Sequence, residues 1–145
     1  MRTAFFIFAA VVTSVFGAAH AGDKSADKAV IETVIQDYFD GIGAADRERL
    51  ERAFAADKAV MVGLGKSGPD TREHYAYTDM NAVIDNWVAN KTPEGTGRDG
   101  EILDMWVRDG IAGVFFRYKD EYYDIRTLLK VEGEWKIATK TYYER

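Results

Sequence analysis

The spacing of hydrophobic positions changes near residue 100 of the chain. In several segments before Lys91, apolar residues recur three and four positions apart, which is the period of a helix with one buried face. After Gly100, apolar and polar residues alternate, which is typical of strands in a sheet. The sequence therefore predicts an α+β domain that ends in consecutive strands.

The first apolar segment predicts a long helix. Its apolar side chains share one face between Val30 and Phe39. Gly41 and Gly43 are expected to end this helix, because glycine readily adopts the left-handed conformation of a C-cap. Asp46 is the expected N-cap of a second helix over Arg47–Ala55.

Two strands and a third helix are expected next. The strands cover Ala59–Leu64 and Thr71–Tyr77, and glycines and a proline mark the turn between them. Thr78 or Asp79 caps the third helix, and a polar, glycine-rich connector over Lys91–Gly100 follows it. The apolar face of this helix comprises Met80, Val83, Ile84, Trp87 and Val88.

The last third of the chain predicts a four-strand antiparallel meander. Asp109-Gly110 is a strong two-residue hairpin signal, and Asp120-Glu121 and Glu132-Gly133 mark the other two turns. The complete order, ααββαββββ, predicts a single domain over residues 22–145. The expected strands are Glu101–Arg108, Ile111–Lys119, Tyr122–Val131 and Glu134–Tyr143.

Three two-residue turns would fix the register of the meander and the face of each side chain. Residues opposite one another on the four strands would form rows across the sheet. On one face, these rows would change from apolar to polar, as the lining of a pocket does. The opposite face would be too apolar to remain in water, and three helices cannot easily cover both faces. We therefore expect a homodimer formed through a sheet face. The rows of the pocket face would be Arg108, Ile111, Lys130 and Trp135; then Trp106, Gly113, Leu128 and Ile137; then Asp104, Phe115, Arg126 and Thr139; then Ile102, Arg117, Asp124 and Thr141.

The first 21 residues have the features of a secretory signal peptide. Arg2 precedes an apolar run over Ala4–Phe16, and Ala19 and Ala21 form an A-x-A cleavage site. This run is shorter than the ~20 apolar residues that span a bilayer. We expect cleavage after Ala21, export to a bacterial periplasm and no stable membrane anchor afterwards.

Charge and composition exclude several classes of function. The chain has 19 Lys and Arg against 24 Asp and Glu, and this acidic balance disfavours binding to nucleic acid. It has no cysteine and, after cleavage, one histidine, so neither a disulfide nor a zinc site is expected. No nucleotide-binding fingerprint is present, and no cofactor or other metal is predicted.

Two segments are similar to the nuclear transport factor 2-like superfamily. The first is Asp37-Tyr38-Phe39-Asp40-Gly41, followed by Asp46 and by Arg52-Ala53-Phe54. The second resembles the "putative lumazine-binding" and SnoaL-like branches, and comprises Tyr123-Asp124, Leu128-Leu129-Lys130, Gly133, Trp135-Lys136-Ile137 and Lys140. The resemblance covers essentially all of residues 22–145.

This resemblance implies a cone, in which a curved antiparallel sheet of about six strands wraps around a long N-terminal helix. It also implies a pocket in the cone and frequent dimerisation. Members of the superfamily include isomerases, dehydratases, cyclases, epoxide hydrolases and binding modules, so the fold does not select an activity.

Resemblance to the ketosteroid isomerases of this superfamily implies candidate catalytic residues. Tyr38 matches a tyrosine that donates to a developing oxyanion, and Asp124 matches an acid on a late strand. The base expected at the end of the first strand is missing, because Val60–Gly63 contains no acid. His74, the histidine that remains after cleavage, is the other candidate proton shuttle.

Each candidate also has a structural interpretation. Tyr38 can be a core residue, His74 a surface residue, and Asp124 the partner of Arg117 in a cross-strand ion pair. Arg126 can be balanced by Asp104 or Asp124, or its planar fork can hold an anionic ligand.

Three hypotheses follow. The first is a non-catalytic exported domain that binds an unidentified small molecule, the second is an isomerase, dehydratase or cyclase of the SnoaL-like type, and the third is an assembly module with a filled cone. The expected ligand-binding residues are Tyr38, Trp106, Phe115, Arg117, Asp124, Arg126 and Thr141.

Overall fold

The computed structural model describes residues 24–90, 95 and 100–145. The predicted signal peptide and most of the connector lie outside these residues. The predicted order ααββαββββ is confirmed. The elements are α1 (Lys24–Ala44), α2 (Arg47–Ala53), β1 (Val60–Lys66), β2 (Arg72–Tyr77), α3 (Met80–Asn90), β3 (Gly100–Arg108), β4 (Ile111–Tyr118), β5 (Tyr122–Val131) and β6 (Glu134–Glu144).

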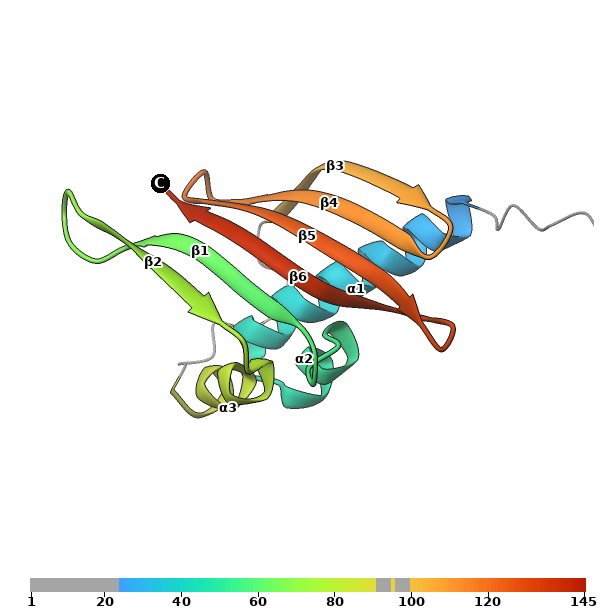
Figure 1. Ribbon diagram of the computed structural model, residues 1–145, viewed down its shortest axis with the longest axis horizontal. Coiled ribbons are helices and arrows are strands. Elements are labelled where there is room, and N and C mark those ends of the chain that lie inside the picture. Colours follow the sequence, from blue (N-terminus) through green and yellow to red (C-terminus); the bar gives the residue numbers. More distant parts are fainter. Residues whose placement is uncertain (1–23, 91–94, 96–99) are drawn as a thin grey trace, which may run out of the picture.

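Six strands among the described residues form one curved sheet in the order β2-β1-β6-β5-β4-β3. All neighbouring strands are antiparallel except β1 and β6, which are parallel. The helix α1 runs along one face of this sheet, and α2 and α3 lie at one end of it (Figure 1). We call the face toward α1 the inner face and the opposite one the outer face. No helix in the described ranges is long and apolar enough to cross a membrane.

The hydrophobic core lies between α1 and the inner face. The helix buries one face, which includes Ile31, Ile35 and Phe39. Opposite it, Leu128 and Ile137 on neighbouring strands are fully buried. The apolar spacing in the sequence therefore identified this buried face, except that Val30, which it placed there, is 49% exposed.

The helix α1 does not end at its glycines. It continues through Gly41 and Gly43 to Ala44, and the left-handed residue that follows is Ala45, with φ of 54°. The Cβ of an alanine at position 41 would lie 3.0 Å from Leu50 Cγ, so Gly41 allows α1 and α2 to approach closely. The prediction that these glycines end the helix was wrong.

Two predicted helix caps are present. The Asp46 side chain accepts a hydrogen bond from the Arg49 amide, as an N-cap does, and the Asp79 side chain accepts one from the Ala82 amide. The second helix ends at Ala53, two residues earlier than predicted. The next residue, Phe54, instead forms a bridge with a strand of the sheet.

The predicted sheet register was wrong at three places. Tyr118 pairs with Tyr122, so the turn between β4 and β5 has three residues, not two. Two irregularities, at Leu103 in β3 and at Ala138 in β6, each shift the pairing by one residue. A shift of one residue moves a side chain to the opposite face, so the predicted pocket face combined residues of both faces.

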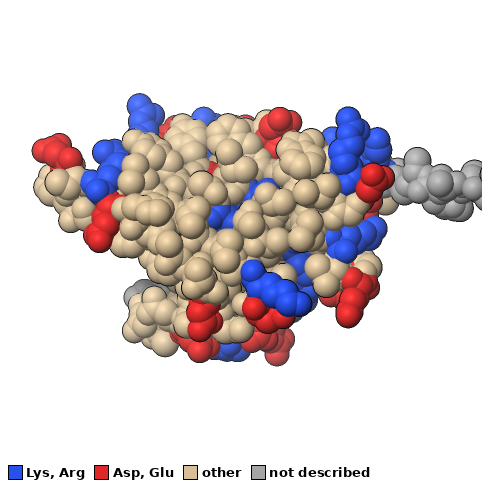
Figure 2. Space-filling model, in the orientation of Figure 1, with Lys and Arg blue, Asp and Glu red and all other residues tan. Residues whose placement is uncertain are grey.

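The outer face carries exposed apolar side chains. On the side of the molecule that faces the viewer in Figure 2, charged groups lie mainly at the ends, and the middle is largely uncharged. The ring of Trp106 lies against Gly113, where an added Cβ would come within 2.3 Å of Trp106 Nε1. We define the outer apolar surface as Trp106, Ile111, Phe115, Ile125, Leu129 and Tyr143.

Candidate functional site

A cavity of about 820 Å³ lies between the inner face of the sheet and the helices α1 and α3. Its lining comes from these two helices and from β1, β2, β4, β5 and β6. Much of the lining is aromatic, as in many pockets for small organic molecules. The aromatic lining residues are Tyr38, Phe39, Tyr77, Trp87, Phe116, Tyr118, Tyr122 and Tyr142.

Four of the lining residues form what we call the buried ionic cluster: Tyr38, Asp124, Arg126 and Lys140. Asp124 is 5% exposed, Arg126 is 1% exposed and Lys140 is 9% exposed. Arg126 Nη2 donates to Asp124 Oδ2 at 2.6 Å, and Lys140 Nζ lies 3.3 Å from the same oxygen. Lys140 Nζ also donates to the Tyr38 hydroxyl at 2.8 Å.

The sheet register brings these side chains together. Asp124 and Arg126 are two residues apart on β5 and therefore point to the same face. Lys140 on β6 is directly opposite Arg126. Tyr38 comes from the buried face of α1.

The guanidinium of Arg126 packs against two aromatic rings. Its Cζ atom is 4.2 Å from the centroid of the Phe116 ring and 4.8 Å from that of the Tyr38 ring. Such contacts stabilise a buried cation and hold its plane in place. The edges of the guanidinium, which carry the N–H groups, are left to make hydrogen bonds.

Several buried polar atoms of the cluster have no hydrogen-bond partner among the described residues. They are Nε and Nη1 of Arg126 and Oδ1 of Asp124. An unpaired buried polar atom is costly, by about 1–3 kcal/mol. The cluster thus has donors and an acceptor that a bound molecule can satisfy.

Exposed residues and tyrosines form the mouth of the cavity. The Tyr122 hydroxyl donates to Glu144 Oε1 at 3.0 Å. Burial, followed by this hydrogen bond, raises the pKa of Tyr122 to about 12. Burial also raises the pKa of Tyr142 well above its usual range. Both hydroxyls therefore keep their protons near neutral pH.

The structure brings together only part of the predicted ligand-binding set. Tyr38, Asp124 and Arg126 share the cavity. The pairing of β3 to β6 places the remaining members on the outer face, outside the cavity. They are Trp106, Phe115, Arg117 and Thr141. Their placement on one face with Asp124 was wrong, because the extra residue in the turn between β4 and β5 and the irregularity at Ala138 move them to the opposite face.

Of the ion pairs expected from the sequence, the one between Asp124 and Arg126 is present and the one between Asp124 and Arg117 is not. Arg117 pairs with Glu101 and Asp120, so it does not pair with Asp124. Asp104 accepts from the Met105 amide, and Asp124 is the carboxylate that balances Arg126.

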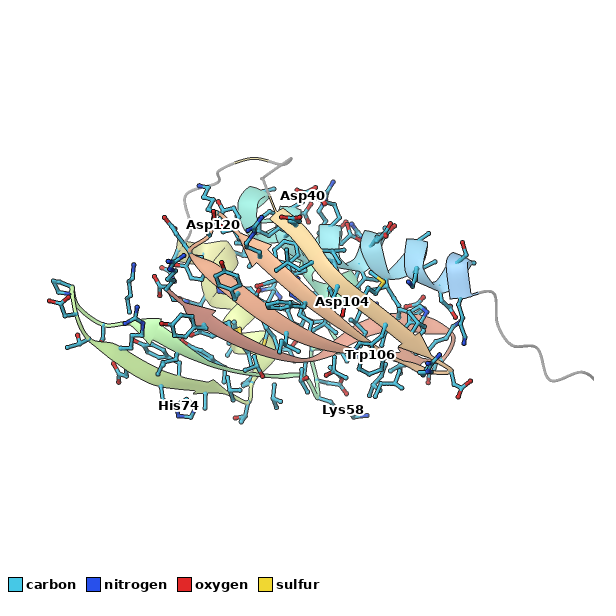
Figure 3. All side chains as sticks on the ribbon, turned by 90° about the horizontal axis from the view of Figure 1, so that it is seen from above. Asp40, Lys58, His74, Asp104, Trp106 and Asp120 are labelled. Atoms are coloured by element: carbon cyan, nitrogen blue, oxygen red, sulfur yellow. The ribbon has the colours of Figure 1, made fainter. Side chains whose placement is uncertain are left out.

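His74 is not part of the cavity. It is an exposed residue of β2, opposite Leu64 of β1. It lies on the side of the sheet away from α1, as does Trp106 (Figure 3). Its position gives no support to its predicted role as a proton shuttle for this cavity.

Lys140 is the functional residue that sequence reasoning assigned to the wrong face. Strict alternation from Ile137 along β6 sends Thr139 and Thr141 to the inner face and Lys140 to the outer one. The irregularity at Ala138 reverses this assignment. No sequence signal marks that position, since an alanine is common in regular strands and in bulges alike.

Comparison with known proteins identifies the family. The family model described as "Putative lumazine-binding" matches residues 26–143. The chain belongs to this family. It has the nuclear transport factor 2-like (NTF2-like) fold, which solved structures share. No curated protein matches the sequence.

Three solved structures illustrate this likeness. An NTF2-like protein of unknown function from Silicibacter pomeroyi DSS-3 has 25% sequence identity and a TM-score of 0.71, over 86% of this chain and 100% of that one. One from Shewanella baltica OS155 has 19% identity and a TM-score of 0.68, over 86% and 98%. A protein from Streptomyces avermitilis, titled "putative dehydratase from the NTF2-like family", has 12% identity and a TM-score of 0.59, over 84% and 98%.

Proposed function

We propose that this protein is an exported domain that binds a small, partly apolar molecule in its cavity without converting it. The observation that carries the proposal is the aromatic cavity of about 820 Å³ with the buried ionic cluster inside it. Pockets for small molecules typically have volumes of about 300–1,000 Å³, with apolar walls and a few directed polar groups. The cavity has this size, and its lining combines aromatic side chains with polar and charged groups.

The cavity argues against an assembly module whose cone is filled by its own side chains. A filled cone would leave no space between α1, α3 and the sheet, and it would pair the polar atoms of its interior. Here the space is present, and three polar atoms of the cluster make no hydrogen bond to a described residue.

The placement of acids argues against proton transfer of the ketosteroid isomerase type. The first strand offers Met61 to the cavity, where that mechanism needs a carboxylate. Asp124, the buried carboxylate of the cavity, contacts the cations of Arg126 and Lys140. A base would have to give up those contacts to accept a proton.

A second candidate function, an isomerase, dehydratase or cyclase, is favoured by one contact. The Tyr38 hydroxyl accepts a hydrogen bond from Lys140, so its own proton can be donated to an oxygen of a substrate. Tyr38→Phe would then abolish turnover of the cavity's ligand. Under the binding proposal, the ligand keeps its mass and structure during incubation with the wild-type protein.

Native mass spectrometry of protein purified gently from its own exported fraction tests the binding proposal. We expect the folded chain to carry a defined small-molecule mass that collisional activation removes. Ala82→Trp, at the exposed end of the cavity lining, should reduce the bound fraction. Ala89→Trp, an exposed residue of the same helix outside the lining, is the matched control. Binding that is equal in both variants would contradict a ligand in this cavity.

A further inference from the structure

We infer that the cavity recognises a ligand with one carboxylate group on a largely aromatic or apolar body, and that Arg126 and Lys140 bind the carboxylate. This inference rests on the proposed binding function and specifies its ligand class. Four observations support it: the charge of the cluster, its unpaired donors, the orientation of Arg126 and the charges at the mouth.

The cluster has an excess of one positive charge. Arg126 and Lys140 are cross-strand neighbours, and both contact a single oxygen of Asp124. All three residues are at least nine-tenths buried. Burying an uncompensated charge is expensive, and an added monoanion would make this cluster neutral.

The unpaired atoms are mainly donors. Arg126 retains Nε and Nη1, and neither donates to a described residue. Lys140 has three N–H groups but only two partners among the described residues, Tyr38 and Asp124. The cluster can therefore give several charge-assisted hydrogen bonds to the two oxygens of a carboxylate.

The surroundings of Arg126 favour a planar anion. The rings of Phe116 and Tyr38 pack close to the guanidinium carbon, and the unpaired Nε and Nη1 at the edge of the group remain for a ligand. A carboxylate is planar and pairs in-plane with the edge of a guanidinium. The same rings, with Trp87 and Tyr142, would contact the rest of the ligand.

The mouth of the cavity disfavours a polyanion. Outside the buried ionic cluster, the part of the lining that the structure describes carries the carboxylates of Asp79, Glu121 and Glu144 and one cation, Lys119. The whole chain has a net charge of -5. A ligand with several negative charges would be repelled at this entrance, whereas a monoanion with an apolar body meets a much smaller barrier.

Pairs of acids and amides of equal shape test the inference. The probes are naphthalene-2-acetate with naphthalene-2-acetamide, and octanoate with octanamide, titrated by calorimetry at constant ionic strength. We expect at least one acid to bind at least tenfold more tightly than its amide. Equal affinity within both pairs would overturn the carboxylate inference and leave small-molecule binding intact. The carboxylate inference would also be overturned if no probe bound. The proposed binding function is tested separately, by native mass spectrometry.

Two variants change the charge of the cluster in opposite directions. Lys140→Met makes the ligand-free cluster neutral, so the preference for the acid should fall at least tenfold while amide affinity stays similar. Asp124→Asn raises the excess to two positive charges, so affinity for the acid should increase. A purely structural ion pair predicts no gain from Asp124→Asn, and a loss of acid affinity there would contradict the inference.

Lys136→Met is the matched control. It removes the same charge from the same strand, but its ammonium contacts the Arg52 carbonyl and lies outside the cavity lining. Acid preference should be unchanged in this variant. An equal loss in Lys136→Met and Lys140→Met would show a general charge effect and would overturn the role of Lys140.

Discussion

At the residue scale, the properties of the cavity depend on which groups are charged and which are neutral. The tyrosines at its mouth are neutral, because burial raises the pKa of Tyr122 and of Tyr142. They act as neutral hydrogen-bond donors or acceptors near a group of exposed carboxylates. The buried ionic cluster behind them supplies the positive charge of the cavity. The entrance of the cavity therefore carries neutral tyrosines and carboxylates, whereas its interior carries a net positive charge.

The raised pKa of Tyr122 predicts a loss of stability in alkaline solution. Its ordinary value of 10.0 applies to the unfolded chain and about 12 to the folded one. The contribution of the neutral hydroxyl is therefore fully present below pH 10 and is lost as the pH rises toward 12. Urea unfolding at pH 8 to 11.5 should show a falling free energy of unfolding above pH 10.

Tyr122→Phe should make this fall shallower, because the group that titrates differently in the two states is gone. Identical slopes in wild type and Tyr122→Phe would contradict the assignment.

At the element scale, the turn after α1 combines close packing with backbone strain. Gly41 allows contact between α1 and α2, and the left-handed position after the helix is occupied by Ala45. Residues with a Cβ pay about 1–2 kcal/mol in this conformation. The hydrogen bond from the Asp46 amide to the Gly41 carbonyl, at 2.8 Å, holds the turn in place.

Ala45→Gly should stabilise the protein by about 1 kcal/mol, because glycine adopts the left-handed conformation without steric cost. The free energy of unfolding in urea measures this. Ala44→Gly, one residue earlier and within the helix, should instead destabilise by about 0.5–1 kcal/mol. Equal destabilisation by both variants would contradict the backbone strain that the φ of Ala45 indicates.

At the scale of the whole molecule, the two faces of the sheet have different surroundings. Helices cover the inner face, and the outer apolar surface is covered by nothing within the described residues. Ile125 is 59% exposed at its centre, which is unusual for an isoleucine in a continuous apolar patch. We propose that a second copy of the chain covers this surface, in agreement with the expectation from the sequence.

Sedimentation velocity at 5 to 50 µM should therefore show a dimer. Ile125→Glu on the outer apolar surface should shift the protein toward a monomer, because it buries a charge in the interface. Val30→Glu, on the exposed side of α1, adds the same charge elsewhere and should leave the dimer intact. A monomeric wild-type protein at 50 µM would contradict the proposal.

Export is the second proposal at this scale, and it rests on residues 1–21 of the sequence. The expected result is a protein in the exported fraction that begins at Gly22, as determined by N-terminal sequencing. Ala19→Asp and Ala21→Asp should block cleavage, because the cleavage site requires small residues. A protein that keeps Met1 and remains with the cytosolic fraction would contradict the proposal.

The sequence by itself determined the order and type of the elements. Helical spacing in the first part, alternation in the last part and short turn signals between strands are local properties, and they predicted ααββαββββ correctly. Along β5 alone, alternation also placed Asp124 and Arg126 together on the face that proved to line the cavity. The family resemblance, carried by short local motifs, was confirmed as well.

Only the tertiary structure decided which residues of different strands share a face. The extra turn residue, Lys119, moved Trp106 out of the predicted pocket face, and the irregularity at Ala138 moved Lys140 into the cavity. The irregularity at Leu103 separated Ile102 from Trp106. Such shifts are set by how the curved sheet packs on α1, and the local sequence does not record them. The side-chain period of a strand is two, so each shift of one residue reverses the inner and outer assignments.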